Sequence, residues 1–292
     1  MGKVSYYSEA LTQGARRSSE GEQLIRSALS QDGVLCFLQP IVDLNQNGRV
    51  VAFEALMRLR DSQHNIIGPG AFIEAAESTA LIHVLSQRLA DQALKVLADP
   101  AFAKRFGKKF LVNINLSRQQ LLDASLVDWL LEGVRTHGVD ARRLQVEVTE
   151  SSVLAEPHTA CMTLRRLREK GIRVALDDFG SGYSSLAQLC ELPLDTVKID
   201  RCLIQDLETE PRKRHVLASV IELCRRLGFG VVVEGVERPA TLDVVRKLGA
   251  KQIQGFIYSR PISVDSTLAT LSPQPQLQPH MVAPSVRLGR QA

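Results

Sequence analysis

The chain has 292 residues, 45% of them hydrophobic and 23% charged, which is ordinary for a globular protein of one large or two small domains. Its formal charge of +4 comes from 36 basic and 32 acidic residues without a long Lys/Arg block, so neither nucleic-acid polymers nor membranes are indicated as partners. The five cysteines are scattered and form no C-x-x-C pair, which argues against a disulfide framework or a zinc site. This cysteine usage favours a reducing cytoplasm. No stretch reaches the roughly 20 apolar residues of a membrane-spanning helix, so we expect a soluble protein.

The two ends of the chain are polar and carry no apolar period. Residues 1–20 are expected to form a flexible arm. Residues 269–292, rich in proline and glutamine, are expected to form a flexible tail. The folded domain is therefore predicted at residues 21–268.

Between the ends, short β-branched runs alternate with longer stretches in which apolar residues recur three and four apart. The short runs predict eight strands, at residues 35–42, 50–57, 110–116, 144–150, 173–179, 196–200, 230–236 and 252–258. The longer stretches predict amphipathic helices at residues 72–97, 125–138, 159–171 and 214–228. Gly171, Gly228 and Gly249 follow basic turns and mark helix ends.

This order of elements predicts an α/β fold. Eight strands, most of them followed by a helix, over roughly 250 residues are typical of a TIM-type (β/α)8 barrel. Residues 43–49, the first connection, are too few for a helix and indicate a hairpin, so we predict a modified barrel with one antiparallel strand. A doubly wound open sheet is the alternative, but the glycine-rich phosphate loop that normally follows its first strand is missing.

Polar side chains recur at the carboxyl ends of the predicted strands. They are Glu54, Asn115, Glu147, Glu150, Asp177, Asp178, Lys198, Glu234 and Gln254. In a barrel these strand ends open onto one face, so at least five carboxylates are expected to converge there. Because like charges a few ångströms apart repel by several kcal/mol at an effective dielectric of about 20, such a cluster calls for divalent cations.

The donor types narrow the choice of metal. The set offers oxygen ligands and no His or Cys, which favours Mg²⁺ or Mn²⁺. Adjacent aspartates can serve two ions, and two ions about 4 Å apart are a recurring device for displacement at phosphorus. Two other interpretations stay open at this point: an enolase-type site with a basic lysine, and acids that are only helix caps or ion-pair partners.

Eight sequence blocks settle the choice by resemblance. In chain order they are QPIVDL, FEALMRL, NINLS, EVTES, DDFGSGYSSL, VKIDR, VVVEGVE and IQGFIYSRP. Together they resemble the EAL family of cyclic di-GMP phosphodiesterases over about residues 22–265. The resemblance implies a modified (β/α)8 barrel, with the second strand antiparallel to its neighbour, that hydrolyses cyclic di-GMP to linear pGpG with two Mg²⁺ or Mn²⁺ ions and is inhibited by Ca²⁺. A catalytically weak EAL domain that acts as a cyclic di-GMP receptor or interaction module is the alternative, and a metal-dependent barrel lyase is a distant third.

The resemblance also implies a role for each matching residue. One metal would be held by Glu54, Asn115, Glu147 and Asp177, and the other by Asp177, Asp178 and Glu234. The catalytic set would be Glu54, Lys198 and Glu234, with Lys198 contacting the nucleophilic water. The substrate would face Gln39, Arg58, Asn115, Asp178, Lys198 and Gln254. Glu150, with Gly180 and Gly182, would anchor the loop at residues 179–185.

The chain departs from common family residues at a few positions, none of them an expected ligand. They are Leu59, Glu74, Ala80 and the pair Cys202 and Leu203. The family further implies a homodimer whose ligand is cyclic di-GMP. A regulatory protein partner stays unknown.

Overall fold

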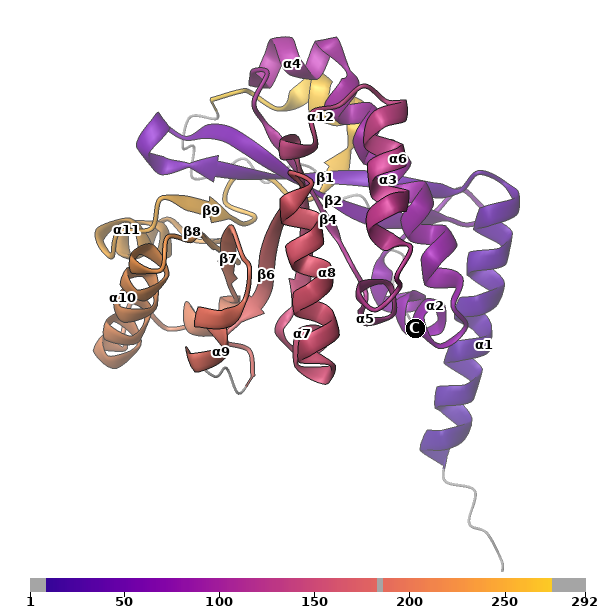
Figure 1. Ribbon diagram of the computed structural model, residues 1–292, viewed down its shortest axis with the longest axis horizontal. Helices are drawn as coiled ribbons and strands as arrows, with labels where there is room; N and C mark the ends of the chain where they lie inside the picture. The colour runs from indigo at the N-terminus through magenta and orange to yellow at the C-terminus, as the bar shows by residue number, and fades with distance from the viewer. Residues whose placement is uncertain (1–8, 183–185, 275–292) are drawn as a thin grey trace, which may run out of the picture.

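The computed structural model, which describes residues 9–182 and 186–274, is a closed barrel of strands surrounded by helices (Figure 1). The barrel strands are β1 (Val34–Asp43), β2 (Arg49–Arg60), β4 (Leu111–Asn115), β5 (Leu144–Thr149), β6 (Arg173–Phe179), β7 (Thr196–Ile199), β8 (Gly230–Val233) and β9 (Gln252–Gln254). Their order is β1-β9-β8-β7-β6-β5-β4-β2, and pairing of β1 with β2 closes the barrel. Two short strands lie outside it: β3 (Ile66–Ile67) pairs with β2, and β10 (Ile262–Ser263) pairs with β1.

One strand of the barrel is reversed, as predicted. β1 is antiparallel to both of its barrel neighbours, β2 and β9, whereas the other pairs in the barrel are parallel. The reversed strand is the first one and not the second, because β2 runs parallel to β4. The β1–β2 connection contains only the short 3-10 turn η1 (Leu44–Gln46) and two left-handed residues, Asn47 and Gly48, which turn the chain straight back.

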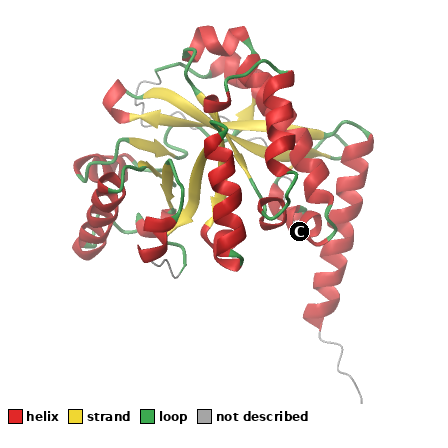
Figure 2. Ribbon diagram, viewed as in Figure 1, coloured by secondary structure: helices red, strands yellow, loops and turns green. Residues whose placement is uncertain are grey.

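Helices cover the outside of the barrel (Figure 2). After α1, which is described below, they are α2 (Ile73–Ser78), α3 (Leu81–Ala98), α4 (Pro100–Phe106), α5 (Arg118–Leu121), α6 (Leu126–Thr136), α7 (Glu150–Ala155), α8 (Pro157–Glu169), α9 (Leu186–Glu191), α10 (Pro211–Arg226), α11 (Pro239–Lys247) and α12 (Val264–Thr270). The 3-10 turns η2 (Pro69–Ala71), η3 (Ala141–Arg143) and η4 (Arg201–Leu203) complete the connections.

The predicted helices are present, and the shorter ones were not foreseen. The stretch 72–97 is split into α2 and α3, and α6, α8 and α10 match the other three predictions. Gly171, Gly228 and Gly249 have positive φ just after helices, as expected for helix ends. The predicted last strand ends early, at Gln254, because the chain then turns and Ile257 N donates to Val236 O at 3.1 Å.

The amino-terminal arm is a correction to the sequence prediction. α1 (Glu9–Ser30) is a helix, so residues 9–20 are helical where a flexible arm was expected. Its second half packs on the body through Ile25 and Ala28, both fully buried, while its first half extends beyond the rest of the molecule (Figure 1). At the other end, α12 reaches Thr270 and so includes the start of the predicted tail. Residues 1–8 and 275–292 lie outside the described part.

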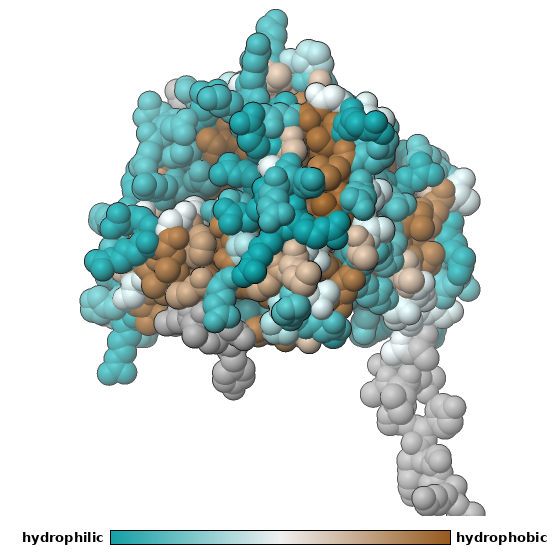
Figure 3. All heavy atoms as spheres, in the orientation of Figure 1, coloured by the Kyte–Doolittle hydropathy of each residue, from teal (hydrophilic) through white to brown (hydrophobic). Residues whose placement is uncertain are grey.

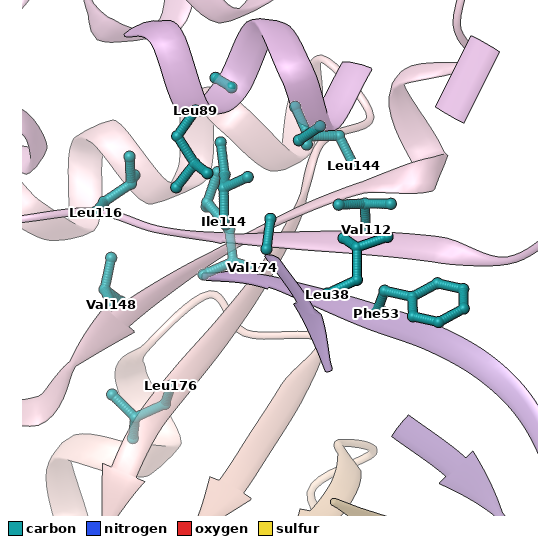
Figure 4. Close-up of a cluster of buried hydrophobic side chains, with 14 of the residues drawn as sticks. Leu38, Phe53, Leu89, Val112, Ile114, Leu116, Leu144, Val148, Val174 and Leu176 are labelled. Carbon is teal, nitrogen blue, oxygen red and sulfur yellow. The ribbon is translucent and has the colours of Figure 1, made fainter. Parts of the chain in front are cut away.

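Successive side chains of each strand point alternately toward the outer helices and into the barrel, so the hydrophobic core and the site lie on opposite faces of the sheet. In β4, Val112 and Ile114 point outward and pack with residues such as Leu89 of α3 (Figure 4), whereas Asn113 and Asn115 lie on the opposite face. The same period points side chains of the other strands alternately toward the helices and into the barrel. Inside the barrel, Ile41, Ala52 and Val232 form a small apolar cluster apart from the outer core, and polar residues such as Glu54 follow toward the carboxyl ends of the strands.

The surface carries few large apolar side chains. Hydrophilic residues cover most of the face in Figure 3, and the hydrophobic patches on it are scattered. Among the described residues, the exposed large hydrophobic side chains are Val84, Met162, Val216 and Phe256. Within the same residues, every helix is too short or too polar to span a membrane.

Ala80 explains the break between α2 and α3 and gives a stability prediction. It adopts a left-handed conformation (φ 56°, ψ 7°) and is exposed, although an L-residue with a Cβ is disfavoured there. Ala80→Gly is therefore expected to stabilise the protein by about 1 kcal/mol, raising Tm by roughly 3 °C. Thermal unfolding checks this, with Ala240→Gly in α11 as the control that should lower Tm. A lower Tm for Ala80→Gly would contradict the strain argument.

Candidate functional site

The strand register brings the predicted polar residues together at one end of the barrel. Glu54 of β2 is opposite Asn113 of β4, and Asn115 is opposite Glu147 of β5. On the next pair, Thr149 of β5 is opposite Asp177 of β6. Lys198 lies in β7, and Glu234 follows β8 directly. Neighbouring parallel strands thus deliver their carboxyl-end side chains to one place.

A single buried ammonium lies at the centre of this group. Lys198 is 1% exposed, and its Nζ lies 2.7 Å from Glu234 Oε1 and 2.8 Å from Glu147 Oε2. The same Nζ lies 3.1 Å from Asp177 Oδ1 and 3.3 Å from Glu54 Oε2. One positive charge therefore faces four carboxylates, which leaves the group negative.

The carboxylates form two clusters that share one residue. Glu54, Glu147 and Asp177 can each place an oxygen within 4.8 Å of the others, and so can Asp177, Asp178 and Glu234. Asp177 is the common member. The family resemblance implied that Asp177 is a ligand of both metals and Asp178 of one, which stays a prediction.

Amide side chains orient Glu54. Asn115 Nδ2 donates to Glu54 Oε1 at 2.7 Å, and Gln254 Nε2 donates to Glu54 Oε2 at 2.6 Å. Gln254 Nε2 also lies 3.1 Å from Gln39 Oε1, and Gln39 Nε2 donates to Ser259 O at 3.3 Å. Gln254 Oε1 is buried without a partner in the described part of the chain, so an acceptor remains for a bound group.

The lysine stays charged. Burial opposes the charged form of Lys198, but the four carboxylates outweigh it, and its pKa lies well above the usual range. Burial likewise disfavours the charged form of Glu54, yet Lys198 and the hydrogen bonds from Gln254 and Asn115 bring its pKa below its ordinary value. Lys198 and Glu54 therefore form the ionised pair of the group.

The negative charge of the carboxylates together is more than one lysine can neutralise. Burial and the charges of Glu54 and Asp177 raise the pKa of Glu147 well above its usual value, in spite of Lys198. Burial raises the pKa of Glu234 to about 8, with Asp177 and Glu54 adding to the effect. The pKa of Asp178 is raised by burial and by Asp177. Without more positive charge, part of the group holds protons.

The residues fit divalent cations. The donors are carboxylate oxygens grouped at ligand spacing, with an excess of negative charge. Asp177 Oδ1 accepts no hydrogen bond of good geometry within the described residues although it is buried, which suits a metal ligand. The set contains no soft donor, in line with Mg²⁺ or Mn²⁺.

A cleft of about 320 Å³ opens above the acids. Its lining comprises Gln39, Glu54, Leu56, Asp177, Asp178, Lys198, Arg201, Glu234, Gly235, Glu237, Gln254, Gly255 and Phe256. Asn115 lines the neighbouring, larger cleft of about 620 Å³, and Leu56 lines both. Arg58 lines neither: it donates to Met57 O at 2.7 Å and its guanidinium lies 5.6 Å from the centre of the Phe37 ring.

The residues predicted to anchor the loop, Glu150, Gly180 and Gly182, follow the ends of β5 and β6. Asp178 has φ 56° and Gly180 φ 95°, so the chain bends sharply after β6. A Cβ at Gly180 would lie 2.3 Å from Leu203 Cδ1, which explains the glycine. Glu150 begins α7 and lines a small apolar cavity with Phe179 and Leu189. Residues 183–185 of the predicted loop lie outside the described part, so its anchoring by Glu150 stays a prediction.

Sequence reasoning missed several residues that the fold brings to the site. Arg201, Glu237 and Phe256 line the cleft, each close in sequence to a residue that was predicted. Asn113 is fully buried, and its Nδ2 donates to Glu147 Oε1 at 2.8 Å. The signal for Asn113 was available, since it is a polar residue two positions before Asn115 in a buried strand and so on the same face.

Asn113 should matter for metal affinity. Asn113→Leu removes the donor that holds Glu147 Oε1, and we expect Mg²⁺ affinity to fall about 10- to 100-fold. Titration calorimetry measures this. The matched control is Gln145→Leu, because Gln145 is opposite Asn113 and accepts a hydrogen bond from Thr196 Oγ1 at 3.2 Å, and within the described residues its side chain has no hydrogen bond to an acid. Equal loss of affinity in both variants would show a merely structural effect.

The fold and the site define an α/β barrel with acidic clusters that could bind divalent metals at the carboxyl ends of its strands. The chain belongs to the EAL domain family, whose model matches residues 22–261. This assignment confirms the resemblance read from the sequence blocks.

Named relatives and solved structures agree with the assignment. The cyclic di-GMP phosphodiesterase NbdA of Pseudomonas aeruginosa is 34% identical over 259 residues, covering 89% of this chain and 33% of NbdA. A structure described as the PaMucR phosphodiesterase in complex with c-di-GMP has a TM-score of 0.78 and 31% identity, over 84% of this chain and 98% of that one. The EAL enzyme Bd1971, bound to cAMP and cyclic di-GMP, has a TM-score of 0.82 and 28% identity, over 89% of this chain and 70% of that one. The chain spans less than half the length of the curated relatives it matches.

Proposed function

We propose that this EAL domain hydrolyses cyclic di-GMP to linear pGpG with two divalent cations, Mg²⁺ or Mn²⁺. The observation that carries the proposal is the pair of carboxylate clusters that share Asp177 around Lys198. The names of the relatives and the titles of the similar structures support the substrate. The proposal concerns this domain only, because the relatives named above are longer than the chain.

Each cluster would hold one ion. Glu54, Asn115, Glu147 and Asp177 would hold the first, and Asp177, Asp178 and Glu234 the second. Bound there, the cations would neutralise the phosphodiester and lower the pKa of the attacking water. Ca²⁺ should inhibit, because its larger radius and looser coordination relax the geometry that the smaller ions impose.

Side chains of the protein would accept the proton of the water and keep the groups of the site in one orientation. Water attacks phosphorus and the bond from phosphorus to the 3′ oxygen breaks, so the water must lose a proton and the 3′ oxygen must gain one. Lys198 Nζ, 2.7 Å from Glu234 Oε1, can donate a hydrogen bond to the water while Glu234 accepts its proton. Asn115 and Gln254 keep Glu54 in one orientation through its two oxygens.

The substrate contacts are proposed in the same cleft. Gln39 and Gln254 line it as a hydrogen-bonded pair, and Asp178, which is half-buried, also lines it. Arg58 could reach a substrate only by leaving its contact with Met57 O. We keep Arg58 as a proposed contact that requires this change of rotamer.

Incubation with cyclic di-GMP and Mg²⁺ or Mn²⁺ tests the function, with pGpG followed by chromatography. Wild type is expected to form pGpG, and Glu54→Ala is expected to form none at a measurable rate. Adding Ca²⁺ should stop the wild-type reaction. If the wild-type protein binds the dinucleotide but yields no pGpG with either metal, the receptor alternative replaces the enzyme.

A further inference from the structure

The cleft above the acids is lined by two basic residues, Lys198 and Arg201, and among the described residues only Lys198 forms ion pairs through its side chain. Lys198 is buried among four carboxylates, as described above. Arg201 also lines the cleft and is exposed. Within residues 9–182 and 186–274, its guanidinium takes part in no hydrogen bond or ion pair. Its charge helps to lower the pKa of Asp200, but no carboxylate of the described residues lies at ion-pair distance, so the guanidinium can still bind a ligand.

The backbone around Arg201 is held firmly. Arg201 begins η4, and Asp200, which precedes it, accepts a hydrogen bond from Cys202 N at 2.8 Å. Gly235, next to Glu234, has φ 68°, and a Cβ there would lie 2.5 Å from Arg201 Cβ. The stem of Arg201 thus packs against the turn after β8, one residue away from a cluster acid. A glycine is needed at that position for this approach.

The proposed substrate has a second phosphate whose negative charge needs a nearby cation, and Arg201 can supply it. Cyclic di-GMP has two phosphodiester groups, and the two-metal site serves only the one that is cleaved. The ring keeps the second phosphate close to the first. Lys198 cannot serve it, because its charge is shared among the acids, and Arg58 is turned toward Phe37. Five carboxylates line the same cleft, so a second anion there needs a cation.

We propose that Arg201 binds the non-reacting phosphate of cyclic di-GMP. This inference rests on the proposed function and adds a residue to it. A guanidinium is always charged and forms two parallel hydrogen bonds to phosphate oxygens, so it suits this position. Arg201 is a binding residue that holds the ring across the cleft while the other phosphate reacts.

Substitution at Arg201 tests the proposal through affinity. Arg201→Ala keeps Cβ and its packing on Gly235 while removing the charge. We expect the KM for cyclic di-GMP to rise about 10- to 100-fold, with kcat within about threefold of wild type. Arg201→Lys should recover part of the affinity, because it restores the charge but not the two parallel hydrogen bonds of the guanidinium. Arg212→Ala in α10 is the control, since Arg212 is exposed and lies outside the cleft lining.

Two further measurements isolate the second phosphate. The preference for cyclic di-GMP over bis(p-nitrophenyl) phosphate, a diester with one phosphate, should fall about 10- to 100-fold in Arg201→Ala. Calorimetric binding of cyclic di-GMP in Ca²⁺ should weaken by the same factor without any turnover. An unchanged affinity in Arg201→Ala, or an Arg201→Lys as weak as the alanine variant, would overturn the role. If wild type does not hydrolyse cyclic di-GMP at all, the proposed function fails instead.

Discussion

Asparagine in place of Asp177 is expected to abolish both metal binding and cyclic di-GMP hydrolysis. Asp177 is the carboxylate that the two acidic clusters share. Its loss removes a ligand from both proposed ions at once, so the fall in kcat should exceed the roughly 100-fold that loss of a residue behind a metal ligand causes. Calorimetric titration with Mn²⁺ and a pGpG assay measure the two effects.

Asp178→Asn is the matched comparison. Asp178 belongs to one cluster only, so this variant should retain one of two ions while Asp177→Asn retains none. Both changes replace an oxygen by nitrogen with nearly the same volume, which separates charge from packing. Near-wild-type activity in Asp177→Asn would contradict the shared role.

Lys198→Met should give the second large effect, on stability as well as activity. The side chain is 1% exposed and faces four carboxylates. Removing the only cation among them should cost the metal-free protein about 3–5 kcal/mol, since uncompensated buried charge remains. Activity should be lost too, because the group proposed to contact the attacking water is gone. Urea unfolding in EDTA and in Mg²⁺ checks the stability effect.

The dependence of the Lys198→Met stability on Mg²⁺ distinguishes an electrostatic cause from a simple packing defect. Mg²⁺ should stabilise Lys198→Met more than it stabilises wild type, because the cations replace the missing positive charge. Lys213→Met is the control, since Lys213 makes an exposed ion pair with Asp206 at 3.2 Å and should lose less than about 1 kcal/mol. A stability loss in Lys198→Met that Mg²⁺ does not reduce would argue against an electrostatic cause.

Much of the fold follows from local patterns. The eight strands and the four long helices carry periods of two and about 3.6, which a sequence shows directly. Helices such as α4 and α7 were missed because six or seven residues contain too few repeats of either period. α1 was missed because its first half is polar, so nothing in its pattern opposes a flexible arm.

The site was predictable at strand ends and less so elsewhere. The barrel rule brings Glu54, Glu147 and Lys198 together, and the structure does so. The rule does not place the guanidinium of Arg58. Strand register fixes the backbone position of a residue but not the rotamer of a long side chain, and this one turns toward Phe37. Arg201 lies in a turn after a strand, where sequence period gives no direction. Its place depends on the packing of η4 on Gly235.

Hydrolysis in ¹⁸O-labelled water shows whether the domain cleaves cyclic di-GMP with water in a metal-dependent reaction. Wild type with Mg²⁺ or Mn²⁺ should convert cyclic di-GMP to pGpG that carries one ¹⁸O on its 5′ phosphate. Glu54→Ala, or wild type in EDTA, should leave the dinucleotide unlabelled and cyclic. If wild-type protein incubated with Mg²⁺ or with Mn²⁺ leaves cyclic di-GMP intact, the domain is not the proposed phosphodiesterase.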